Sequence, residues 1–301
     1  MITTAREVRQ GIEQEAAARN RVRSTMRLDF ARDSGGHTLL RESFQEPPLK
    51  VVRAFALDDG SALAHLHNVS GGLLGGDHLS LQINVEAGAS AQITTTGATR
   101  IYHARRGFSA TTQCNDAIVG EGALLEYLPD AIIPFAGANF FQRTTIDLSE
   151  GAGVFWWEIL APGREASGEV FAYTRVEMRA RVNALGRKIA CENIGVQPGK
   201  HDVASLARFG SYCYSATFYI CRVGMDASYW HATEEHLREV TSSLTRPGET
   251  LWGISTLAAH GLVVRCLARS GRDVLPGLQA VWRQAKMHLY NREAIPPRKV
   301  N

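Results

Sequence analysis

Alternation of apolar and polar residues dominates the first two thirds of the chain. Just after Gly76, apolar residues at positions 79, 81, 83 and 85 alternate with polar ones, a period of two that predicts a half-buried β-strand. Similar runs, rich in β-branched and aromatic residues and separated by short turns, succeed one another from residue 26 to about residue 223. They lie at 53–57, 62–68, 79–86, 91–96, 111–119, 124–128, 143–148, 154–160, 170–182 and 215–223. The pattern predicts a mainly β protein.

A short motif recurs between three pairs of these predicted strands. Glu, Gly and Ala stand close together at 86–89, 121–123 and 150–152, where glycine permits a tight turn and alanine allows close stacking. Two interpretations remain open. The turns are either unrelated hairpin connections, or parts of stacked sheets with a β-helix or solenoid-like topology in which similar turns lie on one another.

Helical periodicity appears only near the C-terminus. Residues 237, 240 and 244 share one apolar stripe, and Thr233 is the predicted N-cap of that helix. A second helix is predicted from about residue 274 to residue 291. Because proline is tolerated in a first turn, Pro276 places the start of this helix near Leu275. Two further strands are predicted between the helices, at 250–258 and 262–268.

The N-terminal segment lacks the strand pattern of the rest of the chain. Residues 1–25 mix arginines with glutamates and contain no apolar core, so we predict a flexible arm rather than a secretory signal. Residues 26–301 are predicted to form a single mainly β domain.

Composition narrows the classes of partner and compartment. The net charge of the 301 residues is only +3 and no run of Lys or Arg occurs, which argues against a nucleic-acid partner. No apolar stretch approaches the ~20 residues of a membrane-spanning helix. The five cysteines are scattered and never spaced Cys-x-x-Cys, which argues against a disulfide framework or a thiolate zinc site. The scattered cysteines fit reduced thiols in a cytoplasmic protein better.

The glycine-rich stretch Gly71-Gly72-Leu73-Leu74-Gly75-Gly76-Asp77 is the sharpest local motif. It is not a phosphate-binding loop, because Asp77 and His78 stand where Lys and Ser or Thr are needed, and because it opens a strand rather than a helix. Asp77 and His78 could form an acid–base pair, although strand neighbours point to opposite faces. The alternative is a tight structural turn in which Asp77 accepts hydrogen bonds.

Two other places could bind a metal ion. His65 and His67 are two residues apart on a predicted strand, so their imidazoles face the same way and make half of a metal site. Glu158 lies in a strand, 154–160, that is apolar on both faces, where a carboxylate is costly unless it is paired or binds a cation. Either Arg164 or another arginine forms a structural ion pair with Glu158, or Glu158 belongs to a polar internal passage.

Catalytic machinery is missing from the sequence. No serine or cysteine lies in a nucleophile elbow and no cofactor fingerprint occurs. A carbohydrate-active enzyme on a β-solenoid would need paired carboxylates, and Glu158 has no second carboxylate on its strand face. We therefore predict that the chain is not an enzyme, with a non-catalytic β-solenoid binding module and the carbohydrate-active enzyme as the alternatives.

Five stretches carry a resemblance to a known family. They are 68–77, 94–102, 125–129 with 134–135, 157–169, and 292–298, and they occur in the expected order over most of the chain. In these stretches the sequence resembles the UreD/UreH family of urease accessory proteins. The matching motif positions are Gly71, Gly72, Gly75, Gly76, Thr94, Thr95, Tyr102, Trp157, Gly163, Arg164 and Gly168.

The resemblance implies a fold of stacked sheets and a role in assembling another protein's metal centre. Members of the family bind the structural subunits of apo-urease and dock the F-type accessory protein and the G-type GTPase, so that Ni²⁺ and carbon dioxide reach the urease active site. The resemblance implies no tightly bound cofactor, only Ni²⁺ in transit. A hydrophilic passage with weak oxygen and imidazole ligands suits such a transfer. Asp77, Glu158 and Glu169 lie in the matching motifs and are expected to line or support it, with His65 and His67 as further candidates.

Overall fold

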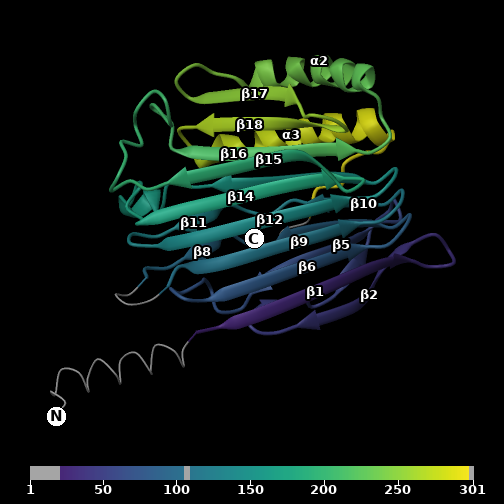
Figure 1. The fold of residues 1–301 in the computed structure, drawn as a ribbon, viewed down its shortest axis with the longest axis horizontal. Helices are drawn as coiled ribbons and strands as arrows, with labels where there is room; N and C mark the ends of the chain where they lie inside the picture. The colour runs from purple at the N-terminus through teal and green to yellow at the C-terminus, as the bar shows by residue number, and fades with distance from the viewer. Residues whose placement is uncertain (1–20, 105–108, 298–301) are drawn as a thin grey trace, which may run out of the picture.

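Two β-sheets lie face to face in this protein, and two helices cover the outer side of one of them (Figure 1). The structure is a computed structural model and describes residues 21–104 and 109–297. One sheet has seven strands in the order β15-β14-β12-β9-β6-β1-β2. The other has eleven strands and takes the path β17-β18-β16-β13-β10-β7-β5-β3, with β4, β8 and β11 paired beside it. The prediction of a mainly β protein with two helices near the C-terminus is confirmed.

Each strand has well-defined bounds. In the seven-stranded sheet they are β1 Arg23–Arg32, β2 Thr38–Gln45, β6 His78–Val85, β9 Thr111–Val119, β12 Asn139–Leu148, β14 Arg175–Ala184 and β15 Arg187–Val196. In the eleven-stranded sheet they are β3 Leu49–Lys50, β4 Ala54–Ala56, β5 Ala62–Asn68, β7 Ser90–Thr95, β8 Thr99–Ile101, β10 Leu124–Tyr127, β11 Ile132–Pro134, β13 Gly153–Leu160, β16 Tyr214–Arg222, β17 Thr250–Thr256 and β18 Gly261–Ala268. β1 thus begins inside the predicted arm, whose residues 1–20 lie outside the described ranges.

From β6 to β14 the chain crosses repeatedly from one sheet to the other. Each return places a strand beside its predecessor in parallel, as β6, β9, β12 and β14 in one sheet and β7, β10 and β13 in the other. Antiparallel strands complete both sheets, β2 and β15 on one and β16, β17 and β18 on the other. The strands of the described residues therefore form two mixed sheets, and the middle of the chain alternates between them.

The three Glu-Gly-Ala turns stack on one another where the chain passes between the sheets. Gly88 donates its N–H to the carbonyl of Glu121 at 2.8 Å, and Gly122 donates to Glu150 at 2.9 Å. Gly88, Gly122 and Gly151 all have positive φ, which glycine adopts without strain. The turns connect strands of different sheets, so the stacked interpretation is correct for them and the hairpin interpretation is wrong.

Both helices begin earlier than the sequence predicts. Helix α2 spans Ala227–Leu244, and its N-cap is Asp226, whose carboxylate accepts the N–H of Tyr229 at 2.8 Å. The prediction of Thr233 as N-cap is wrong, because the helix extends past the apolar stripe and Thr233 is buried inside it. Helix α3 spans Gly271–Tyr290 with Ser270 as its N-cap. It starts one turn before Leu275 and continues through Pro276, which gives up a single backbone hydrogen bond.

Apolar side chains fill two layers. One layer lies between the sheets and includes Met26, Ile83, Val154 and Trp156. The other lies between the eleven-stranded sheet and the helices and includes Trp157, Phe218 and Trp282 among its large residues. A third, smaller cluster lies around Leu73 and Phe140. Of the helices in the described part of the chain, none is both long and apolar enough to cross a membrane.

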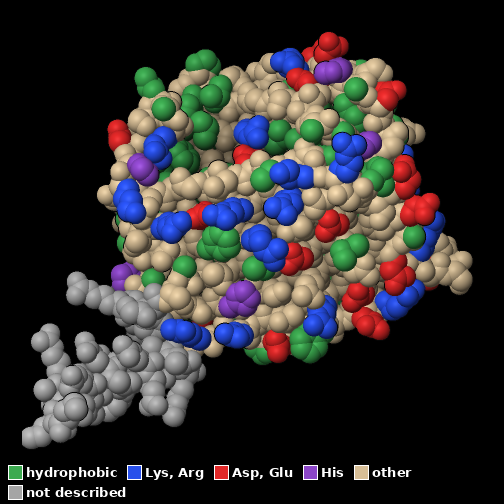
Figure 2. Space-filling view, in the orientation of Figure 1, with side chains coloured by type: hydrophobic (Ala, Val, Ile, Leu, Met, Phe, Trp, Pro, Cys, Tyr) green, Lys and Arg blue, Asp and Glu red, His purple; other side chains and the backbone are tan. Residues whose placement is uncertain are grey.

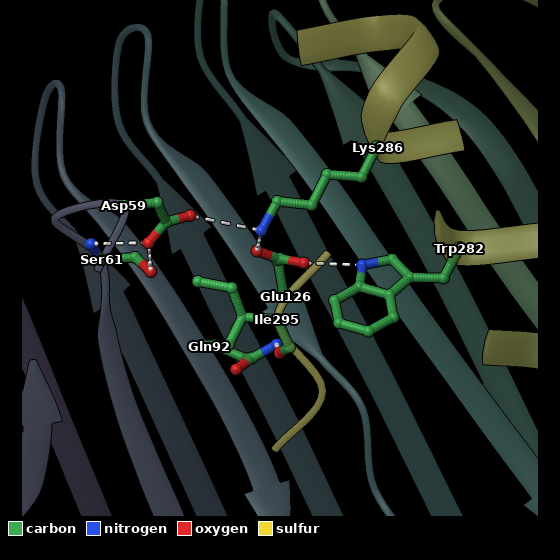
Figure 3. A network of polar contacts seen from close by, with 7 residues as sticks. All are labelled: Asp59, Ser61, Gln92, Glu126, Trp282, Lys286 and Ile295. Carbon is green, nitrogen blue, oxygen red and sulfur yellow. Dashed lines mark hydrogen bonds and ion pairs between the residues drawn. The ribbon is translucent and has the colours of Figure 1, made fainter. Parts of the chain in front are cut away.

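A buried ion pair fixes helix α3 to the sheet beneath it (Figure 3). The ammonium of Lys286 lies 2.7 Å from Oε1 of Glu126, and the indole N–H of Trp282 donates to Oε2 at 2.6 Å. Lys286 is 1% exposed and Glu126 2%, and Asp59 lies 3.5 Å from the same ammonium. Burial raises the pKa of Glu126, against the opposing effects of Lys286 and Trp282. Both carboxylate oxygens are thus satisfied, which a buried charge requires.

The segment after α3 returns to the same place. Gln92 of β7 donates its side-chain N–H to the carbonyl of Ile295 at 3.0 Å, beside Glu126 (Figure 3). The end of the described chain is therefore tied to the middle of the eleven-stranded sheet.

Removing Lys286 should destabilise the protein strongly. In Lys286→Ala the carboxylate of Glu126 stays buried without its cation, and we expect the free energy of unfolding to fall by about 3–5 kcal/mol. The double variant Glu126→Gln/Lys286→Met removes both charges and should recover part of that loss. Urea unfolding, detected by tryptophan fluorescence, measures these differences. The exposed Arg283 of the same helix supplies the control, Arg283→Ala, and an equal effect of control and Lys286→Ala would contradict the assignment.

Candidate functional site: a polar belt between the sheets

Glu158 lies in the interior, in the middle of the eleven-stranded sheet. Every residue of β13 is buried, which confirms that this strand is covered on both faces. Trp157 and Ile159 belong to the layer beneath the helices, whereas Trp156 belongs to the layer between the sheets. Because side chains alternate along a strand, Glu158 faces the same way as Trp156. Its carboxylate therefore points at the seven-stranded sheet, with only 8% of the residue exposed.

Three neutral groups donate hydrogen bonds to one oxygen of Glu158. Oε1 accepts from the hydroxyl of Thr144 at 2.7 Å, from the amide of Gln142 at 2.8 Å and, at a longer 3.4 Å, from the indole of Trp156. Gln142 and Thr144 come from β12 in the facing sheet. Within residues 21–104 and 109–297, no cationic side chain forms an ion pair with Glu158.

The predicted ion pair between Glu158 and Arg164 is wrong. The turn at Pro162 and Gly163 carries Arg164 past the end of β13, where its guanidinium pairs with Glu169 and lies 4.3 Å from the centre of the Phe135 ring. Glu169 also accepts the backbone N–H of Ala136 at 3.1 Å. The pair of Arg164 and Glu169 thus holds a surface loop together. An ion pair with Arg164 therefore does not explain the buried carboxylate of Glu158.

The surroundings of Glu158 shift its titration. Burial raises the pKa of its carboxyl to about 6, the donors Thr144, Trp156 and Gln142 lower it, and the nearby charge of Glu192 raises it further. At neutral pH the carboxylate is therefore mostly ionised. It is a buried negative charge held by dipoles alone, a condition that a passing cation would relieve.

Glu158 belongs to a row of polar side chains that crosses the strands inside the sandwich. We call this row the polar belt, and its members are Gln113, Asn115, Gln142, Thr144, Glu158, Glu192 and Thr217. Gln113 donates to Asn115 at 3.0 Å, and Asn115 donates to Thr144 at 3.3 Å. Beyond Glu158, Tyr219 donates its hydroxyl to Glu192 at 2.9 Å.

A cavity lies at each end of the polar belt. One, of about 200 Å³, is lined by Gln113, Tyr127 and the glycine-rich loop at Gly71 and Gly72. Its Tyr127 ring stacks on Trp156 with the ring centres 4.0 Å apart. The other, of about 250 Å³, is lined by Glu192, Tyr219 and Arg265. The belt thus extends from one cavity toward the other, with Glu158 between them.

Asp77 organises the glycine-rich loop. Its carboxylate accepts the backbone N–H groups of Leu74 at 2.8 Å and Val22 at 3.1 Å, and the residue is 4% exposed. His78 points to the outer face, where it bonds to Thr112. The structural-turn interpretation is therefore correct, and the structure does not bring Asp77 into the polar belt.

The glycines of this loop allow close approach of the backbone to Tyr102. Gly71 and Gly76 have positive φ, and Gly75 lies between them in the same turn. A Cβ on Gly72 would lie 2.5 Å from the Tyr102 ring. The hydroxyl of Tyr102 in turn donates to the carbonyl of Gly71 at 3.2 Å.

The other motif positions hold neighbouring strands and their loops together. Thr94 donates to the carbonyl of Leu128 at 2.6 Å, and the indole of Trp157 donates to the carbonyl of Pro129 at 2.8 Å. Thr95 accepts the backbone N–H of Asp130 at 2.8 Å. Gly163 and Gly168, both with positive φ, shape the loop around the short helix η1 (Glu165–Ser167). These positions serve the fold and lie beside the belt rather than in it.

His65 and His67 lie together on β5, as predicted. Both are half-buried and line a pocket of about 760 Å³ with Phe55 and Ile295 among its other walls. The Phe55 ring packs edge-on against His65 at 5.8 Å. Across the described ranges, no three His, Cys, Asp or Glu side chains converge as a metal site, so this pair gains no third ligand of that kind.

Sequence reasoning missed most of the polar belt. In β12, Phe140, Ile146 and Leu148 mark the buried face, and Gln142 and Thr144 lie on the same face because side chains alternate along a strand. Two consecutive polar residues on an otherwise apolar strand face were a usable signal. Glu192 was missed because β15 was not predicted as a strand.

Glu158→Gln tests whether an ionised carboxylate is buried here. The folded-state pKa of about 6 exceeds the ordinary value of 4.5, so the wild-type protein loses stability as pH rises through this interval. The amide does not titrate, so the stability of the variant relative to wild type should increase by about 2 kcal/mol between pH 4.5 and about pH 7. Urea unfolding at several pH values, with the exposed Glu42→Gln as control, measures this. A difference that does not change with pH would contradict it.

Comparison with known proteins agrees with the family resemblance of the motifs. The family model described as "UreD urease accessory protein" matches residues 22–301. The chain is 45% identical over 287 residues to the urease accessory protein UreD of Herpetosiphon aurantiacus, covering 95% of this chain and 99% of that one. It is 34% identical to the UreD of Cenarchaeum symbiosum over 63% of this chain and 67% of that protein. It is also 27% identical to the UreD of a Bacillus species, over 77% and 83%. The chain belongs to the UreD family of urease accessory proteins.

Proposed function

We propose that this protein is a non-catalytic adaptor that binds apo-urease together with the F-type accessory protein and the G-type GTPase, and that its polar belt conducts Ni²⁺ toward the urease active site. The observation that carries the second part is Glu158, an ionised carboxylate with no cation partner in the described chain. We expect the protein to act in the cytoplasm, with Ni²⁺ as cargo rather than as a resident cofactor.

The ligand chemistry of the belt suits transfer better than storage. One carboxylate attracts a divalent cation, while amide and hydroxyl oxygens are weak ligands for nickel. Thr144 places its hydroxyl oxygen within hydrogen-bond distance of Glu158. The side-chain amides of Gln142 and Asn115 lie beside these two residues and donate to them through their nitrogens, so each would offer its oxygen to a cation only after turning over. A site built this way favours entry of the ion without holding it firmly.

The remaining predicted carboxylates support the shape of the protein in this proposal. Asp77 fixes the loop that lines one cavity, and Glu169 fixes the loop after β13. His65 and His67 remain a proposed outer contact for nickel, on the wall of their own pocket.

The alternative function, a carbohydrate-active enzyme, has little support. Glu192 is the carboxylate whose charge raises the pKa of Glu158. It is already hydrogen-bonded to Tyr219 and paired with Arg265, and both glutamates lie between the sheets. A polysaccharide chain needs an open groove with two available carboxylates. A binding module without metal would leave the uncompensated charge of Glu158 unexplained.

Replacing Glu158 should impair nickel delivery to urease without impairing the binding of this protein to apo-urease and the two accessory proteins. Urease would be purified from cells that carry the wild type, Glu158→Ala, Glu158→Gln or the surface control Glu42→Gln. We expect roughly tenfold or greater loss of bound nickel and of urease activity with both Glu158 variants. Copurification of each variant with apo-urease and the two accessory proteins should stay unchanged.

Two outcomes would count against the proposal, and they are distinguishable. Full nickel loading with Glu158→Ala would remove the conducting role of the belt and leave the adaptor role standing. Active, nickel-loaded urease in a strain that lacks this gene altogether would remove the adaptor role as well.

A further inference from the structure

One broad face of the protein is left uncovered by residues 21–104 and 109–297. Helices α2 and α3 pack on the eleven-stranded sheet, and no helix of the described residues lies over the outer face of the seven-stranded sheet. In that sheet β1, β6, β9, β12 and β14 are paired in parallel. Parallel sheets in soluble proteins usually have both faces covered. An exposed parallel face is therefore a place where another molecule is expected.

Arginines gather on this face. Arg143 of β12 and Arg179 of β14 are direct register neighbours, and Arg175 and Arg181 flank Arg179 on the same face of β14. Their side chains are about half exposed, at 48% for Arg143, 52% for Arg175 and 56% for Arg179. Lys and Arg side chains collect at the level of these two strands in Figure 2.

The positive charge of this group is only partly neutralised. Glu177 pairs with both Arg175 and Arg179, and Asp116 pairs with Arg143 at 3.1 Å. In the described part of the chain no carboxylate pairs with Arg181. Four guanidinium groups thus share two carboxylates, and like charges directly opposite on neighbouring strands destabilise a sheet. Carboxylates supplied from outside would offset that repulsion.

Arg175 and Arg179 are also held in place by neighbouring side chains. The guanidinium of Arg179 lies over the ring of Phe141 at 5.4 Å, and Glu177, whose side chain is only 9% exposed, pairs with both Arg175 and Arg179. Guanidinium groups in fixed positions bind carboxylates through two parallel hydrogen bonds at little further cost in entropy.

We propose that the face formed by Phe141, Arg143, Arg175, Arg179 and Arg181, the arginine face, docks an acidic surface of a partner protein. The interspersed Glu177 and Asp116 favour a protein over a nucleic acid, because a continuous row of phosphates would meet these two carboxylates, whereas a protein surface can place Asp and Glu between them. The choice of partners to test rests on the proposed function.

Charge reversal at Arg181 tests the arginine face. Arg181→Glu and the milder Arg181→Ala would be compared with Arg283→Glu, an exposed arginine on helix α3 that likewise has no ion-pair partner among the described residues. Binding to purified apo-urease, F-type accessory protein and G-type GTPase would be measured separately by biolayer interferometry at low and at physiological salt. Circular dichroism would confirm that each variant is folded.

We expect one of the three proteins to bind Arg181→Glu at least about tenfold more weakly than wild type, with a smaller loss for Arg181→Ala and none for Arg283→Glu. Wild-type affinity for that protein should fall as salt rises. Unchanged affinity of Arg181→Glu for all three proteins overturns this inference and leaves the proposed function intact. The inference is also overturned if Arg181→Glu binds duplex DNA or phosphatidylserine vesicles more weakly than wild type while its affinity for the three proteins is unchanged. Failure of the wild type to bind any of the three overturns the proposed function and this inference together.

Discussion

The strand register of the seven-stranded sheet is the constraint on which the rest of the structure depends. A shift of one residue in a β-strand moves every side chain to the opposite face. In β12 and β14 such a shift would send Arg143 and Arg179 into the core and expose Gln142 and Met178. The same register therefore determines the apolar layer, the polar belt inside it and the arginine face outside. The stacked turns at Gly88, Gly122 and Gly151 fix it, because their backbone hydrogen bonds join consecutive passages of the chain.

Two buried glutamates in this protein have opposite surroundings. Glu126 on β10 faces the helices and has the ammonium of Lys286 beside it, so its charge is paired within the protein itself. Glu158 on β13, the next strand, faces the other sheet and has only neutral donors. The first arrangement resists removal of either partner, whereas the second leaves room for a cation to come and go. This contrast directs attention to Glu158 rather than to the better-paired cluster in Figure 3.

Strand patterns predicted most of the long strands and the burial of Glu158, because strand periodicity is local information, but they missed β2 and β15. They could not predict partners. Arg164 is close to Glu158 in sequence, but the turn at Gly163 takes it to Glu169. Lys286 was overlooked because a lysine beside an apolar helix stripe is normally exposed, and only the position of Glu126 across the sheet explains its burial. The polar belt depends on pairings between strands far apart in sequence, which local patterns do not contain. The helix starts at Asp226 and Ser270 were missed because the apolar stripes begin later than the helices do.

The ion pair between Glu126 and Lys286 also bears on how the protein is made. The two residues are 160 positions apart, and the lysine belongs to helix α3. During synthesis the strands around Glu126 leave the ribosome well before their counter-charge exists. The interface between the eleven-stranded sheet and its helices therefore closes only after helix α3 has been synthesised, and until then its tryptophan-rich surface is open to chaperones and to aggregation.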